Sequence, residues 1–355
     1  MSFIAGWIAR IGILEFFSVL LILMNMLAFF LYVIDKRKAV KNKWRISENT
    51  LIFFTLAFGG IGALLGMRLA RHKTKHTKFR IATAIGLIVA LIPAVHIIHG
   101  LTLDKTVRYA ELEFHSENWP PDLNGYRIAF LTDMHTITHD AMGKVAAELN
   151  ARNVDLLLLG GDFSMSGEHY NGTIREIAMI KATDGIFGVE GNHDDYRRIF
   201  AAYAQCGITP LDNNGIRIRD GFYLAGVHDM WNRSPNIEAA IANANTGAGA
   251  NAGAGVNDFV LLVSHNPDVS MVQSTAGVNL VLSGHTHGGQ ITFFGIPLYL
   301  LSGSITDYGM RFAAGFAESK GGVPVFTCRG VGDYYAVPRI FARPEVVIFI
   351  MYSDI

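Results

Sequence analysis

Hydrophobic residues are distributed very differently along the two parts of this chain. Near the N-terminus they form three long and nearly unbroken runs, over residues 12–34, 51–67 and 80–101. The first and third are long enough to cross a bilayer as helices, and the second, which is rich in glycine, is at the short limit. Three buried helices of a soluble core are the alternative, but the runs exceed the usual length of soluble helices. We therefore expect an all-α membrane domain over residues 1–101.

Beyond this region, short apolar runs alternate with helical patterns and with turns rich in glycine and aspartate. The runs YRIAFL, VDLLLL, FVLLV and VNLVLS have the length and composition of strands. Strands that alternate with helices predict an α/β domain with covered sheets, here over residues 102–355. Residues 242–257 are almost wholly Ala, Asn and Gly, so they predict a flexible surface insert with too little apolar surface to pack.

Charge divides the chain at the same place. The chain is formally neutral, yet residues 1–101 contain 13 Lys and Arg against 3 Asp and Glu, whereas residues 102–355 contain 17 against 27. The acidic half would repel a polyanion, which argues against nucleic acid as substrate or partner. The basic half, with its apolar runs, points to membrane lipid instead, because cationic segments attract anionic headgroups.

Two basic segments separate the apolar runs, and they constrain the topology. Residues 36–45 and 68–80 contain six Lys and Arg each. If all three runs cross the membrane, one basic segment lies outside, against the positive-inside rule. If the glycine-rich second run enters and returns, both stay in the cytoplasm and the α/β domain lies outside. A three-span path that starts outside would put that domain in the cytoplasm. We expect it outside.

Aspartate, asparagine and histidine gather at the ends of the predicted strands. Five strand ends supply the set Asp133, His135, Asp162, Asn192, His193, His265, His285 and His287. In α/β folds, functional residues gather just past the C-terminal ends of strands. Alternate residues of an extended segment point the same way, so each D-x-H or H-x-H pair can aim two ligands into one site. Glycines beside these residues leave room for a substrate.

Each of these pairs is a weak signal alone. A lone buried histidine is more often a core residue than a ligand, and GD or GN at a turn is ordinary turn chemistry. Two Asp, one Asn and four His together, in a chain with 13 His, indicate a metal site. A shell of carboxylates and imidazoles suits Mn, Fe or Zn. Seven ligands are too many for one ion and suit two divalent metal ions that share a carboxylate.

The motifs DMH, GGD, GNHD, SH and GHTHGG occur in this order and resemble those of the calcineurin-like metallophosphoesterases. Over residues 105–352 the chain is similar to a branch of bacterial, often membrane-associated or exported phosphodiesterases near the UDP-2,3-diacylglucosamine hydrolases. The resemblance implies two packed mixed β-sheets flanked by helices, with a dinuclear centre between strand ends. Residues 27–93 resemble a small bacterial membrane domain without an agreed activity. We expect an integral protein of a bacterial inner membrane.

The resemblance also implies a role for each site residue. The first metal would be held by Asp133, His135 and His287, the second by Asn192, His265 and His285, and Asp162 would bridge the two. His193 would donate a proton to the leaving oxygen, and Asp194 would orient its imidazole. Either Arg329 or Arg339 could contact the phosphate of a substrate. The plainer interpretation is that these arginines form surface ion pairs.

These features predict a membrane-tethered, metal-dependent phosphoester hydrolase, either a phosphodiesterase or a pyrophosphatase. Its substrate would be a lipid-linked, nucleotide-linked or other diffusible phosphoester, attacked by a water that two metals activate near neutral pH. The alternative is a scaffold or sensor that retains the fold while the membrane domain works. The complete ligand set argues against that alternative, because a decayed site would be expected to lose ligands.

Overall fold

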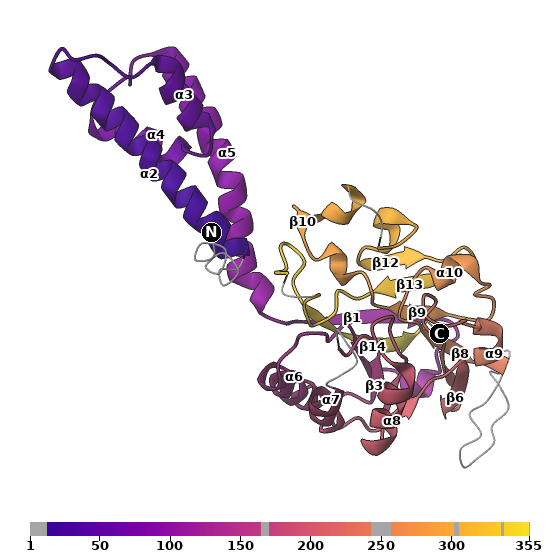
Figure 1. Cartoon of the computed structure of the whole chain (residues 1–355). Helices are drawn as coiled ribbons and strands as arrows, with labels where there is room; N and C mark the ends of the chain where they lie inside the picture. The colour runs from indigo at the N-terminus through magenta and orange to yellow at the C-terminus, as the bar shows by residue number, and fades with distance from the viewer. Residues whose placement is uncertain (1–12, 165–169, 243–256, 302–304, 335–336, 355) are drawn as a thin grey trace. The chain divides into compact units, whose positions relative to one another are not determined.

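The computed structural model describes residues 13–164, 170–242, 257–301, 305–334 and 337–354 (Figure 1). The chain divides into two compact units, Met1–Leu103 and Asp104–Ile355. The predicted insert at 242–257 lies almost wholly outside the described residues.

The first unit is helical. Its helices in the described residues are α2 (Ile13–Val40), α3 (Glu48–Leu56), α4 (Gly60–Leu69) and α5 (Thr77–Leu101). Both α2 and α5 are long and apolar enough to cross a membrane. The second apolar run is not a single helix. The helical conformation is interrupted between Leu56 and Gly60, which divides this run into α3 and α4.

A polar residue of α2 stabilises this break. Phe58 adopts a left-handed backbone conformation (φ 64°). Asn25 Nδ2 donates to the Phe58 carbonyl at 2.9 Å, and Asn25 Oδ1 accepts from the Gly62 N–H, also at 2.9 Å. The amide thus satisfies backbone groups that the interrupted helix leaves open, as an apolar environment requires. A Cβ on Gly62 would lie only 1.8 Å from the Asn25 carbonyl oxygen, so glycine is needed for this close packing.

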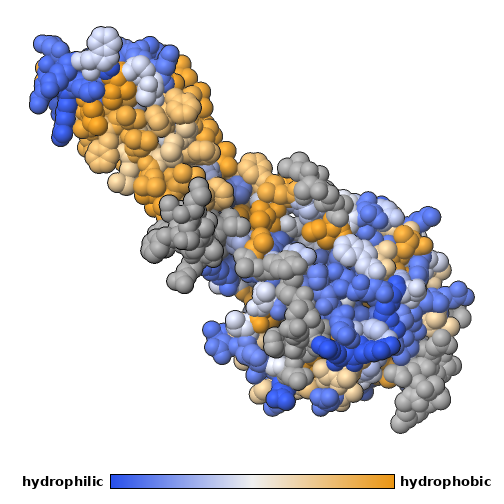
Figure 2. All heavy atoms as spheres, in the orientation of Figure 1, coloured by the Kyte–Doolittle hydropathy of each residue, from blue (hydrophilic) through white to orange (hydrophobic). Residues whose placement is uncertain are grey.

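Both basic segments lie at the same end of the helical unit. The buried carboxylate of Asp35 in α2 accepts from Arg45 at 2.6 Å and lies 2.7 Å from His72 Nε2. Glu48 at the start of α3 accepts from Lys73. Figure 2 shows this end as hydrophilic surface above a broad hydrophobic surface. Helix α3 therefore begins at the basic end of the unit, and α4 ends there, so the chain reverses direction between them.

The second unit contains two six-stranded mixed sheets, which confirms the predicted fold class. The first has the order β1-β14-β2-β3-β4-β5, with β1 (Arg108–Ser116), β2 (Tyr126–Leu131), β3 (Leu156–Leu159), β4 (Ile186–Gly188), β5 (Thr209–Pro210) and β14 (Glu345–Ser353). The second has the order β12-β13-β9-β8-β7-β6, with β6 (Asn214–Arg219), β7 (Phe222–Gly226), β8 (Phe259–Val263), β9 (Leu280–Ser283), β12 (Gly315–Glu318) and β13 (Pro324–Thr327). Strand β14 pairs antiparallel with β2, whereas β2, β3, β4 and β5 run parallel.

Helices cover the outer faces of both sheets. They are α6 (His139–Ala151), α7 (Tyr170–Ala178) and α8 (Tyr196–Gln205) on the first sheet, and α9 (Ile237–Ala242) and α10 (Val269–Val272) on the second. Alternate residues of β2 show the arrangement: Ile128 and Phe130 pack between the sheets, and Ala129 and Leu131 pack under the helices. Burial on both faces explains why these strands are uninterrupted apolar runs.

Short elements complete the unit. They are the 3-10 helices η1 (Leu103–Lys105), η2 (Pro121–Leu123), η3 (His287–Gly289), η4 (Leu298–Leu301) and η5 (Gly309–Phe312), and the two-stranded hairpin β10 (Thr292–Phe293) and β11 (Ile296–Pro297). The hairpin follows η3 directly, so it begins beside two of the histidines predicted as ligands.

Candidate metal centre

The carboxyl ends of β2, β3, β8 and β9 meet the loop after β4 at one place between the sheets. Five of the predicted ligands there have left-handed backbone conformations, with φ of 54° at Asp133, 34° at His135, 57° at Asp162, 72° at His285 and 53° at His287. Residues other than glycine rarely adopt this region, and such strain gathers at functional sites. These backbone conformations direct the side chains of the five residues toward one another.

The predicted ligands form two buried clusters. The ligand atoms of Asp133, His135 and His287 lie within 4.8 Å of one another, and so do those of Asp162, His265 and His285. Asp162 Oδ2 lies 3.2 Å from His265 Nε2 and 3.3 Å from His135 Nε2, one histidine of each cluster. One carboxylate oxygen therefore stands between the two clusters, where a bridging ligand belongs.

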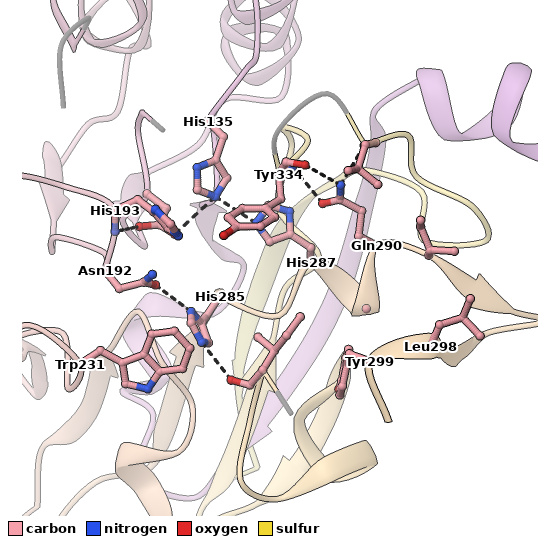
Figure 3. A pocket seen from close by; sticks show the side chains of 15 residues that line it. His135, Asn192, His193, Trp231, His285, His287, Gln290, Leu298, Tyr299 and Tyr334 are labelled. Carbon is pink, nitrogen blue, oxygen red and sulfur yellow. Dashed lines mark hydrogen bonds and ion pairs between the residues drawn. The ribbon is translucent and has the colours of Figure 1, made fainter. Parts of the chain in front are cut away.

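Asn192 completes the second cluster. Its Oδ1 lies 2.9 Å from His285 Nδ1 (Figure 3). The same Oδ1 lies 3.0 Å from His265 Nε2. The structure thus brings all seven predicted ligands together. Oxygen and nitrogen donors are at hand for two ions, and thiols are not among them, which fits divalent metals such as Mn, Fe or Zn.

The outward nitrogens of two histidines are held by backbone carbonyls. His265 Nδ1 lies 2.7 Å from the Gly160 carbonyl oxygen, and His285 Nε2 lies 3.1 Å from that of Ile305. If each of these nitrogens donates its proton to the carbonyl, the other nitrogen of the ring faces the cluster. Such contacts orient metal-binding imidazoles.

Burial sets the protonation of most of these histidines. It lowers the pKa of His135 to about 4 and that of His285 to about 3, so both are neutral near pH 7, as metal binding requires. For His265 burial is the largest cause and acts downward, but the charge and hydrogen bond of Asp162, together with the charges of Asp133 and Asp229, outweigh it and raise the pKa well above its ordinary value. Burial raises the pKa of Asp133 to about 6, against the opposing charge of His265. A proton on His265 is therefore what a metal must displace.

Arg339, which the sequence left as a phosphate contact or a member of a surface ion pair, lies behind the first cluster. It is buried, which contradicts the expected surface ion pair. Its Nη2 lies 3.1 Å from His287 Nδ1, and its Nη1 donates to the carbonyls of His287 (3.2 Å) and Ala342 (3.0 Å). Burial and this guanidinium charge together hold the pKa of His287 well below its usual range. The other arginine considered, Arg329, pairs with Glu345 at 2.9 Å.

His193 and Asp194 differ in where their side chains lie. The half-buried His193 ring lines the cavity beside the clusters, with its centroid 5.4 Å from that of His135. The Asp194 carboxylate is buried and accepts from the backbone N–H groups of Asp162 (2.8 Å), Phe163 (2.9 Å) and Gly191 (2.9 Å). These bonds assign Asp194 to positioning the Asp162 loop, in place of the expected contact with the His193 imidazole.

A cavity of about 340 Å³ opens over the clusters. Its far wall is largely apolar and aromatic, and Figure 3 shows Trp231, Leu298, Tyr299 and Tyr334 around the histidines. The Trp231 ring stands perpendicular to that of His285, with centroids 4.4 Å apart. The sequence did not predict these wall residues, because they lie on loops or in the short η4, which have no repeating pattern.

Comparison with known proteins agrees with this geometry. Residues 126–289 match the family model of the calcineurin-like phosphoesterases, and residues 25–79 match that of a domain of unknown function, DUF1294. A transmembrane protein with metallophosphoesterase domain from Danio rerio is 26% identical over 330 residues, 85% of this chain and 70% of that protein.

Two bacterial proteins each match a part of the chain. Phosphodiesterase YaeI of Escherichia coli (strain K12) is 28% identical over 260 residues, 67% of this chain and 84% of that protein. The uncharacterized protein YsdA of Bacillus subtilis (strain 168) is 44% identical over 72 residues, 20% of this chain and 81% of that protein.

Proposed function

Since the chain belongs to the calcineurin-like metallophosphoesterases, and is thereby a metal-dependent phosphoester hydrolase, we propose that it is a phosphodiesterase tethered to a bacterial inner membrane. The observation that carries the proposal is the position of Asp162, whose Oδ2 lies 3.2 to 3.3 Å from one histidine of each cluster. Such an arrangement suits a dinuclear centre, in which two metals clamp a phosphoester.

The ligand sets are those of the two clusters. One divalent ion would be held by Asp133, His135 and His287. The other would be held by Asn192, His265 and His285, and Asp162 would be a ligand of both. When bound, the ions supply Lewis acidity that activates water and offsets phosphate charge.

The chain's own residues do the rest of the work. His193 lines the cavity and would donate a proton to the leaving oxygen, a contribution on the order of 10²- to 10⁴-fold. Asp194 fixes the loop that carries Asp162. Trp231 and Tyr334 line the cavity beside the predicted ligands.

The test is metal-dependent hydrolysis of bis(4-nitrophenyl) phosphate by the full chain, with Asp162→Asn as the variant. We expect the variant to bind fewer than two ions and to lose turnover. Asp258→Asn is the matched control, because Asp258 pairs with Arg217 away from the cavity. A variant at position 162 that keeps two ions and full turnover would refute the bridging role.

For the membrane we propose that α2 and α5 cross and that α3 and α4 enter and return. The support is that both basic segments lie at one end of the helical unit. The positive-inside rule assigns that end to the cytoplasm. The start of α2 and the phosphoesterase unit after α5 then lie outside the cytoplasm. A fluorescent protein that matures only in the cytoplasm, fused after Ile355, should stay dark; a bright fusion would contradict this topology.

A further inference from the structure

The β10–β11 hairpin exposes apolar side chains. Phe293, Phe294 and Ile296 are 47%, 53% and 55% exposed, and Leu298, which follows the hairpin, is 40% exposed. Residues 291–299, ITFFGIPLY, include no charged side chain. A water-soluble surface rarely carries such a cluster, and apolar patches of this kind mark interaction sites.

The same hairpin forms a rim of the catalytic cavity. Ile291 precedes β10 and Leu298 follows β11, and both line the cavity together with His193 and His287. In Figure 3, Leu298 and Tyr299 lie on the side of the cavity away from His193. A partner that binds the hairpin would therefore also lie next to the opening of the cavity that contains the predicted metal ligands.

The hairpin also lies beside the first residue of the phosphoesterase unit. The Phe294 and Phe341 rings lie 5.5 Å apart, and the Phe341 N–H donates to Asp104 Oδ2 at 2.9 Å. Thr292 is bonded to the neighbouring Ile340, whose carbonyl accepts from the Thr292 N–H at 2.9 Å. These contacts all lie within the second unit. Through Phe341 they link the hairpin to Asp104, the first residue of that unit.

Connectivity limits how far that start can be from the membrane. Helix α5, apolar enough to cross a bilayer, ends at Leu101, and Asp104 follows three residues later. Three residues span at most about 10 Å. Asp104 therefore stays close to the end of α5, and the hairpin, which is linked to Asp104 through Phe341, is held near the bilayer surface.

We propose that the β10–β11 hairpin inserts its phenylalanines into the interfacial layer of the bilayer that holds α2 and α5. Aromatic and aliphatic side chains without nearby charge favour this layer. The cavity then opens at the membrane surface and takes a phosphodiester whose lipid chains stay in the bilayer. This last step rests on the proposed phosphodiesterase function; the insertion does not.

Insertion is tested without any enzymatic readout. A single cysteine at position 293 is labelled with bimane in the full-length Cys206→Ser protein, where Cys328 is buried. The protein is reconstituted into vesicles of phosphatidylethanolamine and phosphatidylglycerol with a brominated-acyl phosphatidylcholine. We expect the label to be quenched, whereas a label at position 179, where the native Met179 is 63% exposed, is not. Equal quenching, or none, at the two positions overturns the proposal.

The substrate step is tested with Phe293→Asp and, as the matched control, Met179→Asp. Hydrolysis is measured on bis(4-nitrophenyl) phosphate and on a diacylglycerol 4-nitrophenyl phosphodiester in vesicles. We expect Phe293→Asp to lose roughly tenfold on the lipid only, because the apolar anchor is lost. An equal effect on both esters overturns the substrate step. Quenching at position 293 without hydrolysis of either ester by the parent protein would leave the insertion standing and the phosphodiesterase function refuted.

Discussion

Replacing Arg339 by methionine tests whether the metal centre depends on a cation behind it. The guanidinium is buried and donates to the carbonyls of Gly332, His287 and Ala342, besides contacting His287 Nδ1. Methionine fills much of the same space and leaves these acceptors without their partner. Each buried acceptor left without its donor costs about 1–3 kcal/mol, so with three carbonyls we expect a loss of about 3 kcal/mol or more in the free energy of unfolding.

The same substitution should weaken metal binding. Arg339 Nη1 donates to the backbone carbonyl of His287 and so holds this predicted ligand in place. Groups that position a ligand in this way contribute about 10- to 100-fold in metal affinity, which is the loss expected at the His287 cluster. Stability is measured by urea denaturation in detergent, followed through the fluorescence of the buried Trp119, and affinity by competition with a chelator. Arg152→Met is the control, since its pair with Glu111 is partly exposed and contributes below about 1 kcal/mol. Unchanged metal affinity in Arg339→Met would refute the reasoning.

Three further outcomes are expected. His193→Asn should keep both metals yet lose about 10²- to 10⁴-fold on esters with poor leaving groups, and near-normal turnover on such esters would exclude the proton-donor role. Asp194→Ala should lower the free energy of unfolding by about 3 kcal/mol, because three buried N–H groups lose their acceptor at about 1 kcal/mol or more each; unchanged urea midpoints would contradict this. Because the raised pKa of His265 keeps a proton on it that a metal must displace, metal affinity should rise by up to about tenfold per pH unit near neutrality. Calorimetry in two buffers of different ionisation enthalpy should then show proton release on binding, and its absence would count against the His265–Asp162 pair.

The strands and the metal ligands could be predicted because their signals are local. Strands buried on both faces are continuous apolar runs, and ligands such as Asp133 and Asp162 follow such runs directly. The role of Asp194 was harder to predict, since a carboxylate next to a histidine in sequence suggests a pair. Its partners are instead backbone N–H groups, one of them 32 residues away at Asp162.

Features that depend on distant contacts had no local signal. The second apolar run reads as one helix, and its break is stabilised by Asn25, 33 residues from Phe58. Arg339 meets His287 across 52 residues, and nothing local in the sequence links the two. The contact between Phe294 and Phe341 likewise brings together segments that the sequence keeps apart.

The bridging position that we propose for Asp162 would couple the occupancy of the two metal positions. A carboxylate that faces a histidine of each cluster is oriented by whichever ion arrives first, so the second position is already organised when the next ion arrives. By linkage each ion then raises the affinity for the other, typically by about 1–3 kcal/mol when such coupling is present. Titration of the protein with metal would be sigmoidal, and species with a single ion would be scarce. A lesion in one cluster would consequently empty both.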